Sequence, residues 1–168
     1  MRAPERLALM EVERVAKLAT EGLPQGEALD VGTGTGVFAE ALANLGWSVS
    51  GVDANPELLK LAAHHVPTAH FRQAPAEDLP FETSAFDLVF LGHVLHETDD
   101  PVAALMQSRR VARHRVAVLE WPYRDEEHGP PLEHRLAPDI VLKFAQQAGF
   151  SGVEHIELAH MDFYRMQI

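Results

Sequence analysis

Three glycines lie where a strand–turn–helix unit would hold a nucleotide-like ligand. Gly32, Gly34 and Gly36 follow an apolar run over residues 28–31 and precede a helical pattern. Glycine lets the backbone approach a ligand closely, and a helix N-terminus offers free N–H groups to it. Ligands of open α/β sheets bind at the carboxyl ends of the strands. The sequence therefore predicts a cofactor site at this turn.

The spacing of the glycines and two acids indicates which cofactor fits. The dinucleotide fingerprint G-x-G-x-x-G needs a glycine where this chain has Val37, and no Gly-Lys-Ser/Thr follows as in a phosphate-binding loop. Asp30, just before the glycines, would repel a pyrophosphate and attract an ammonium or sulfonium group. Asp53 ends the next predicted strand, where an acid can bind both hydroxyls of a ribose. Together these features predict an adenosine-type cofactor that carries positive charge.

Side chains able to move a proton gather at or beyond the ends of the predicted fourth and fifth strands. Histidine titrates near neutral pH, and a general base is needed only where the acceptor is protonated at the working pH. No pair stands out, and a structural or surface role remains open for each residue. We take His93 and His96 as the catalytic candidates. The full set is His93, His96, Glu120, Tyr123, His128 and His134.

Metal chemistry is not expected. His93, His96 and Glu97 differ in order and spacing from the zinc motif His-Glu-x-x-His. The chain has no cysteine, which excludes disulfides, zinc–thiolate sites and iron–sulfur clusters. His64 and His65 end a predicted helix, where positive charge is favourable, so a capping role explains them.

Apolar runs alternate with amphipathic stretches along the chain, which predicts an α/β fold with a parallel sheet. We expect a three-layer, Rossmann-like, seven-stranded and mostly parallel sheet with helices on both faces. The expected strands are 28–31, 47–52, 69–71, 86–91, 115–120, 153–158 and 163–168, the last two antiparallel. The expected helices are 4–21, 37–45, 56–65, 101–112 and 138–148.

Length and charge limit the classes of partner. The 168 residues predict one domain, and 14 basic against 25 acidic residues give a formal charge of −11. Such a balance argues against nucleic acid and against anionic membranes as partners. No apolar run approaches the roughly 20 residues that span a bilayer. The charged N-terminal stretch lacks the apolar region of a signal peptide, so a cytoplasmic location is expected.

Four ordered motifs resemble those of class I S-adenosylmethionine-dependent methyltransferases. They are LDVGTGTG (29–36), GVD (51–53), AEDLPF (76–81) with SAFDLVF (84–90), and VLHE (94–97). The resemblance is strongest to the small-molecule group typified by ubiquinone/menaquinone-biosynthesis methyltransferases, and it runs from about residue 25 onward. It implies S-adenosylmethionine as the cofactor and a small molecule as the methyl acceptor.

The resemblance also implies roles for individual residues of the cofactor site. Asp30, Gly32 and Gly34 would lie by the methionine end of the cofactor, and Asp53 would bind the ribose. Ala76 and Glu77 would lie against the adenine, mostly through their backbone. Gly92 would line the wall near the methyl group together with His93.

Two departures from the family pattern stand out. Pro75 occupies the position where many relatives have an acid that accepts a hydrogen bond from the adenine amine. Residues 112–115 replace the Pro-Gly-Gly turn that relatives tend to have before the fifth strand. The first departure removes or moves one adenine contact, and the second leaves the chemistry unchanged.

The acceptor side is expected to depend on residues 121–136, a segment with three prolines and Gly129. Residues 1–24 are predicted to form one N-terminal helix with little left over for a lid. We therefore expect 121–136 to act as a lid loop over His93 and His96, more mobile than the sheet when no acceptor is bound. If this segment cannot cover the pocket alone, a second subunit would complete it in a homodimer.

Two other functions stay open beside S-adenosylmethionine-dependent methyl transfer to a small molecule. The first is a non-catalytic S-adenosylmethionine-binding module or subunit, which the short segment before residue 25 favours. The second is an NAD-dependent oxidoreductase, against which Asp30 and Val37 argue. The sequence does not name the acceptor.

Overall fold

Residues 2–168 are described by a computed structural model, in which seven strands alternate with six α-helices. The strands are β1 (Glu27–Val31), β2 (Ser48–Asp53), β3 (His70–Gln73), β4 (Phe86–Gly92), β5 (Ala112–Glu120), β6 (Gly152–Glu157) and β7 (Asp162–Gln167). The helices are α1 (Pro4–Leu9), α2 (Val12–Thr20), α3 (Val37–Asn44), α4 (Pro56–His65), α5 (Pro101–Val111) and α6 (Pro138–Gln147), with a 3₁₀ turn over Leu132–His134.

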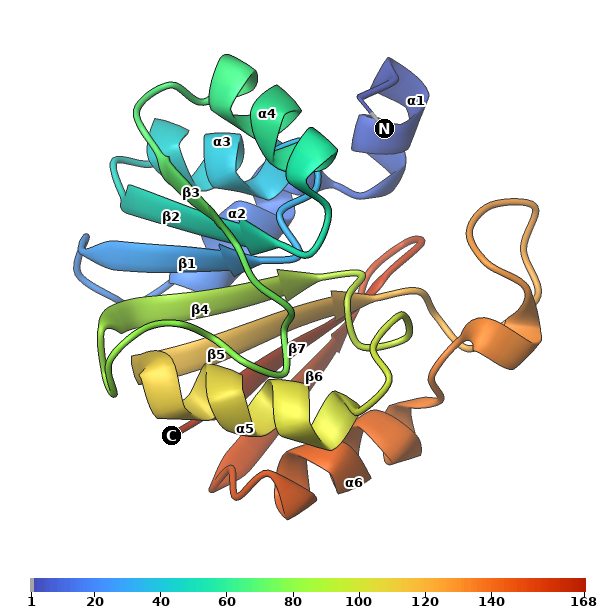
Figure 1. Ribbon diagram of the computed structural model, residues 1–168. Coiled ribbons are helices and arrows are strands. Elements are labelled where there is room, and N and C mark those ends of the chain that lie inside the picture. The colour runs from blue at the N-terminus through green and yellow to red at the C-terminus, as the bar shows by residue number, and fades with distance from the viewer. Residues whose placement is uncertain (1) are drawn as a thin grey trace.

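The strands form one sheet in the order β3-β2-β1-β4-β5-β7-β6. β1 to β5 are parallel, and β7 runs antiparallel to both of its neighbours (Figure 1). The expected seven-stranded, mostly parallel sheet is confirmed. The order reverses between β1 and β4. The carboxyl ends of the strands at such a switch point are where α/β folds bind ligands.

Local signals begin the two helices that lead away from β2 and β4. The side chain of Asn55 accepts a hydrogen bond from the Glu57 N–H (3.0 Å), and that of Asp100 accepts one from the Ala103 N–H (2.9 Å). A proline follows each cap as the first helical residue. These are the favoured residue types at a helix start because the cap satisfies a free N–H and proline has none to lose.

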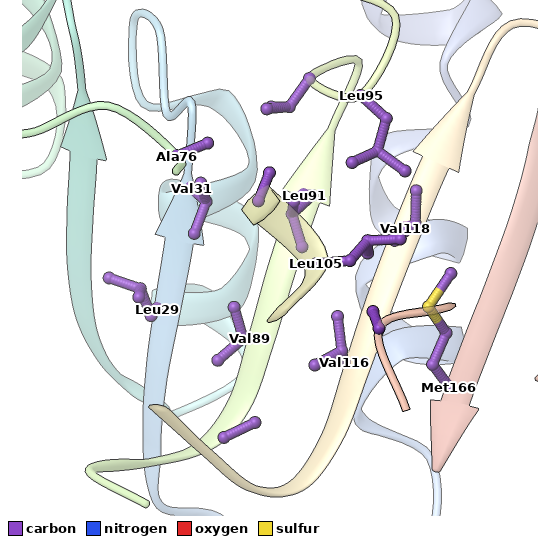
Figure 2. Packing of buried hydrophobic residues seen from close by; sticks show 14 of the residues in the cluster. Leu29, Val31, Ala76, Val89, Leu91, Leu95, Leu105, Val116, Val118 and Met166 are labelled. Carbon is purple, nitrogen blue, oxygen red and sulfur yellow. The ribbon is translucent and has the colours of Figure 1, made fainter. Parts of the chain in front are cut away.

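The sheet is buried on both faces, and alternate residues of each central strand supply the two cores. Leu29, Val89 and Val116 belong to the core beneath α5 and α6, together with Leu105 of α5 (Figure 2). The residues that alternate with these along the central strands point to the opposite face of the sheet, where they pack with α2 and α3. Each buried Leu or Val side chain contributes about 1.5–3 kcal/mol through loss of exposed apolar area.

The N-terminal region differs from the single helix expected over 4–21. Two helices form instead, because Glu11 adopts a left-handed conformation (φ 46°) between α1 and α2. The break lets Met10 enter the core and turns α1 toward the carboxyl ends of the strands (Figure 1). The expectation was wrong because apolar spacing continues across the break, whereas the turn is imposed by tertiary contacts.

Candidate cofactor and acceptor site

The glycine loop joins β1 to α3, and the conformation of all three glycines requires that residue type. Gly32, Gly34 and Gly36 have φ values of 66°, 56° and 79°, a region that other residues rarely adopt. A Cβ on Gly32 would lie 2.4 Å from Cγ2 of Val94. The loop is therefore locked both by backbone conformation and by close packing.

Asp30 holds the loop against the start of α3. Its carboxylate is 2% exposed, and Oδ2 accepts hydrogen bonds from the Thr33 hydroxyl (2.6 Å) and the Ala39 N–H (3.0 Å). Burial raises the pKa of Asp30 to about 7, against the opposing effect of these two hydrogen bonds. Both bonds fall on Oδ2, which leaves Oδ1 as the oxygen available to a cation.

Asp53 lies at the end of β2 and connects to the same loop. Its Oδ2 accepts a hydrogen bond from the Gly34 N–H (2.8 Å), and its Oδ1 accepts one from the Asn55 N–H (2.8 Å). A carboxylate oxygen has two lone pairs, so each keeps one for a ligand hydroxyl. The structure thus brings together Asp53 and Gly34, two of the residues expected to bind the cofactor.

The remaining cofactor candidates follow the ends of β3 and β4. Ala76 buries its methyl group in the core, which leaves its backbone as the polar part. Glu77, its neighbour, is partly exposed. Gly92 ends β4 beside Phe38 and Phe90, and a Cβ there would lie 2.9–3.1 Å from their rings. Contacts of these residues with a cofactor remain predictions.

A cavity of about 560 Å³ opens where α1 meets the loops that follow β4 and β5. In Figure 1, α1 (dark blue) and the loop after β5 (orange) both lie beyond the carboxyl ends of the parallel strands. The cavity brings 121–136 together with His93 and His96, as the acceptor prediction requires. Its walls are Ala3, Glu5, Arg6 and Leu9; His93, His96 and Glu97; and Trp121 with 127–130.

The contribution of α1 overturns one expectation. The N-terminal part was expected to leave little for a lid, yet α1 forms one wall of the cavity. Arg2 docks it by donating two hydrogen bonds to the Thr35 carbonyl (3.0 and 3.2 Å) and one to Glu40 (2.7 Å). The segment that forms this wall of the cavity therefore contacts the glycine loop through Arg2.

His93 follows β4 in a left-handed conformation (φ 60°) that is uncommon for residues other than glycine, although histidine is among the types found there more often. Its N–H donates to the Leu119 carbonyl (2.8 Å), and its ring packs 4.8 Å from the Trp121 ring. Both ring nitrogens are shielded from solvent and lack a hydrogen-bond partner among residues 2–168. Burial lowers the pKa of His93 to about 4, and Arg6 and His96 oppose its protonation further, while Glu120 favours it.

His96 has the opposite environment. Its Nδ1 lies 2.7 Å from Oε2 of Glu120, and its backbone N–H donates to Oε1 (3.3 Å). The two side chains are 6% and 1% exposed. Burial lowers the pKa of His96, but the hydrogen bond and charge of Glu120 outweigh it, so the net change is upward. Glu120 is thus the partner of His96.

The other proton-transfer candidates separate in space. His128 lines the cavity. Tyr123 is 51% exposed, and His134 is exposed on the 3₁₀ turn, and neither belongs to the cavity wall. Sequence position beyond the fifth strand could not distinguish them because the loop folds back on itself.

Arg135 is a residue that sequence reasoning missed. It is 5% exposed and donates hydrogen bonds to the carbonyls of Pro122 (3.1 Å), Arg124 (2.9 Å), His128 and Pro130 (2.9 Å). Its guanidinium lies 5.6 Å from the centre of the Trp121 ring. The guanidinium of Arg135 thus holds four carbonyl groups of residues 122–130 around it. Nothing in the local sequence distinguishes it from a solvent-exposed arginine.

Two features are absent from residues 2–168. No three His, Asp or Glu side chains of this part of the chain lie close enough to hold a metal ion. No helix within it is long and apolar enough to cross a membrane.

Comparison with known proteins gives the family. A family model described as "Methyltransferase domain" matches residues 29–119, from the glycine loop through nearly all of β5. The chain belongs to this methyltransferase domain family. The match includes Asp30, Asp53 and His93, and it ends before the loop after β5 that lines part of the cavity.

Relatives of this methyltransferase domain include an uncharacterized methyltransferase of Synechocystis sp., 40% identical over 117 residues (66% of this chain, 54% of the relative). A demethylmenaquinone methyltransferase of Chlorobaculum parvum is 32% identical over 99 residues (58% and 41%). A ubiquinone/menaquinone biosynthesis C-methyltransferase of Citrifermentans bemidjiense is 26% identical over 184 residues (86% and 77%). The chain spans about half the length of the first two relatives.

The methyltransferase domain also resembles a solved structure over nearly its whole length. The crystal structure of a SAM-dependent methyltransferase from Aquifex aeolicus matches 99% of this chain and 94% of that chain, with a TM-score of 0.89 and 26% identity. The similarity includes the part of this chain outside the family match, so it extends to the segments that line the cavity.

Proposed function

We propose that this protein transfers a methyl group from S-adenosylmethionine to a small-molecule acceptor. The observation that carries the proposal is the hydrogen bond between Asp53 and the Gly34 N–H, which joins an acid at the end of β2 to a glycine loop at the end of β1. This arrangement suits a ribose beside a backbone turn. The similarity to the Aquifex aeolicus enzyme supports the same cofactor.

The residues present fit S-adenosylmethionine. Asp53 has a free lone pair on each oxygen for the ribose hydroxyls. Asp30 offers a carboxylate oxygen near the positively charged methionine end, beside Gly32 and Gly34, where no Cβ intrudes. Ala76 and Glu77 would lie against the adenine, and Gly92 near the methyl group. When bound, the cofactor supplies an electrophilic methyl group.

His93 and His96 are proposed to serve the acceptor. A displacement at a good leaving group depends mainly on positioning and on exclusion of water, which a walled cavity provides. His93 supplies an unpartnered imidazole in the wall, and His96 is held by Glu120. Residues 121–136 form the cover on one side, and we propose that this cover loosens to admit the acceptor.

The size of the cavity and the names of the relatives support a small-molecule acceptor. A volume of about 560 Å³ lies in the range that holds metabolite-sized ligands. Relatives named for demethylmenaquinone and ubiquinone/menaquinone biosynthesis methylate small molecules. The alternative of a non-catalytic S-adenosylmethionine-binding module is less favoured, because such a module would not need a shielded, unpartnered histidine. An NAD-dependent oxidoreductase is disfavoured by Val37.

Three further proposals concern the domain organisation, the location and partners, and the oligomeric state of the protein. We propose that residues 1–168 act as one domain, that the protein works in the cytoplasm without nucleic acid or membrane partners, and that a homodimer forms if the cavity needs more cover. The formal charge of −11 supports the second.

Isothermal titration calorimetry tests the proposal directly. S-adenosylmethionine and S-adenosylhomocysteine should each bind saturably with one site per chain, whereas NAD should not. The proposal is contradicted if neither S-adenosylmethionine nor S-adenosylhomocysteine gives a heat of binding up to millimolar concentration. Turnover against a panel of small acceptors then separates an enzyme from a non-catalytic module.

A further inference from the structure

We propose that the acceptor enters the cavity as an uncharged hydroxyl compound and that His93 receives its proton during methyl transfer. The proposal rests on the proposed function, to which it adds the chemical class of the acceptor and the residue that receives the proton. Three observations carry it: the unpartnered ring of His93, the strain of its backbone, and the charges around the cavity.

The ring of His93 lacks what buried polar groups normally have. Both nitrogens are shielded from solvent and unpartnered among residues 2–168, while the residue lines the cavity. Buried polar atoms nearly always make hydrogen bonds because desolvation without a partner is unfavourable. A neutral imidazole offers one donor and one acceptor. A ligand hydroxyl in the cavity can pair with one of them.

The backbone of His93 adopts an uncommon conformation that fixes the position of this ring. His93 adopts φ 60° and is clamped by its N–H bond to the Leu119 carbonyl and by packing against Trp121. Such strain persists only where the surroundings over-determine it, and it is concentrated at functional sites.

Burial keeps the ring of His93 neutral. The charged or titratable groups that face it are Arg6 from α1, His96 from the same loop and Glu120 from β5, with Glu5, Glu97, Glu127 and His128 on the same cavity wall. Burial outweighs the attraction of Glu120 and lowers the pKa of His93 to about 4. At neutral pH the ring therefore has a free lone pair but is a weak base.

A weak base can receive the proton of a hydroxyl acceptor, but it cannot deprotonate an ammonium group before the amine attacks. An alkylammonium group has a pKa of about 10 and must lose its proton before it can attack, which His93 would accomplish only about one time in a million. A hydroxyl oxygen attacks with a lone pair that it already has. Its proton becomes strongly acidic only as the new bond forms, so a base of low pKa suffices.

The cavity also disfavours anionic acceptors. Three carboxylates, Glu5, Glu97 and Glu127, line it against the single guanidinium of Arg6. His96 is paired with Glu120, so it does not offset these carboxylates. Like charges across a binding site suppress the wrong partner. An uncharged hydroxyl acceptor is not repelled by these carboxylates, and it does not have to lose a proton before it attacks.

The proton and electron balance follows from these roles. The acceptor oxygen forms a bond to the methyl carbon, and the electron pair of the cleaved carbon–sulfur bond stays on sulfur. The hydroxyl proton passes to the unprotonated ring nitrogen of His93, which becomes an imidazolium. His93 returns this proton to water after the product leaves.

Binding of three probes with one carbon frame tests the proposal without turnover. The protein, saturated with S-adenosylhomocysteine, is titrated at pH 7.5 with 2-naphthol, 2-naphthoate and 2-naphthylmethylamine. We expect 2-naphthol to bind at least tenfold more tightly than either charged probe. His93→Asn, which suits the left-handed backbone, should lose at least tenfold in naphthol affinity, whereas His134→Asn, outside the cavity, should not.

Nitrogen-15 spectra of the imidazole rings give a second readout. His93 should be neutral at pH 7.5, and its ring signals should shift when 2-naphthol is added. Failure of S-adenosylhomocysteine to bind would overturn the proposed function and the acceptor assignment with it. If S-adenosylhomocysteine binds, the acceptor assignment alone is overturned by a charged probe that binds as well as naphthol, by no probe binding, by an unaffected His93→Asn variant, or by a charged His93 ring.

Discussion

The glycine loop and the acceptor cavity adjoin each other, yet they are assembled from very different stretches of chain. The cofactor side is drawn largely from one short turn, Gly32–Gly36, with Asp30 and Asp53 tied to it by hydrogen bonds. The acceptor side needs α1, the loop after β4 and the loop after β5. Local conformation therefore determines the first, and long-range contacts determine the second.

This difference has a consequence for how each side responds to change. A loop locked by backbone conformation should fail sharply when a glycine is replaced. A cavity enclosed by three segments should respond to changes in charge and in buried hydrogen bonds. Five predictions test the comparison, from the largest expected effect to the smallest.

Gly32→Ala should lower the free energy of unfolding by about 4 kcal/mol, because left-handed strain adds to overpacking against Val94. Gly22 has a similar φ of 76° with nothing within 4 Å of a Cβ. Gly22→Ala is therefore the matched control and should cost only about 1–2 kcal/mol. Urea denaturation measures both. Equal losses would show that packing does not lock the loop.

His93 should make the protein less stable in acid. Its folded pKa of about 4 lies below the unfolded value, so the unfolded chain binds a proton first as pH falls. This stability is present above about pH 6.5 and is lost between 6.5 and 4, by roughly 3 kcal/mol. His93→Asn should remove that part of the acid dependence. Parallel pH profiles for the two proteins would contradict the assignment.

Asp53→Ala should weaken S-adenosylmethionine binding by about tenfold to a hundredfold, since a hydrogen bond to a charged group is worth about 1.5–3 kcal/mol. Glu82→Ala removes an exposed acid far from the loop in sequence and should leave affinity unchanged. Calorimetry compares the two. An unchanged dissociation constant for Asp53→Ala would place the ribose elsewhere.

Arg135→Lys should lower the free energy of unfolding by about 2 kcal/mol, because an ammonium cannot reproduce the fan of hydrogen bonds to four carbonyls. Hydrogen exchange should show 122–130 exchanging faster than the central strands in the wild type, and faster still in the variant. Arg124→Lys, an exposed neighbour, provides the control. Protection of 122–130 equal to that of the strands would rule out a lid.

His96→Gln should have the smallest effect and the opposite pH dependence to His93. The pKa of His96 is raised in the folded state, so its pairing with Glu120 stabilises fully below the unfolded pKa and fades as pH rises through the folded value. The variant should thus lose about 1 kcal/mol more at pH 6 than at pH 9. A loss independent of pH would mean that the pair does not titrate.

Much of the cofactor side could be predicted because its signals are local. Gly32, Gly34 and Gly36 stand where φ is positive, and Asp30 and Asp53 lie at strand ends that alternating patterns locate well. The predicted helix starts at residues 56 and 101 agree with the structure, where Asn55 and Asp100 cap these helices. Errors were confined mainly to strand ends, such as the start of β5 at Ala112 rather than at residue 115.

The acceptor side could be predicted only in outline. Residues 121–136, His93 and His96 were expected together because the loops after β4 and β5 leave the same edge of a parallel sheet. The wall formed by α1 was missed, since the left-handed turn at Glu11 interrupts an otherwise continuous helical pattern. Arg135 and Arg2 were missed because most of their partners are backbone carbonyls, which leave no trace in residue type, and Glu40, the side-chain partner of Arg2, lies 38 residues away in the sequence.

The sequence by itself determined the sheet, the glycine loop and the acids beside it, because periodicity, glycine conformation and capping act over a few residues. Only the tertiary structure decided the states of the two histidines. His93 and His96 are three residues apart and chemically identical, yet one is buried against Trp121 without a partner and the other meets Glu120. Their opposite pKa shifts arise from burial and from a carboxylate on a different strand, and neither is encoded near the histidines themselves.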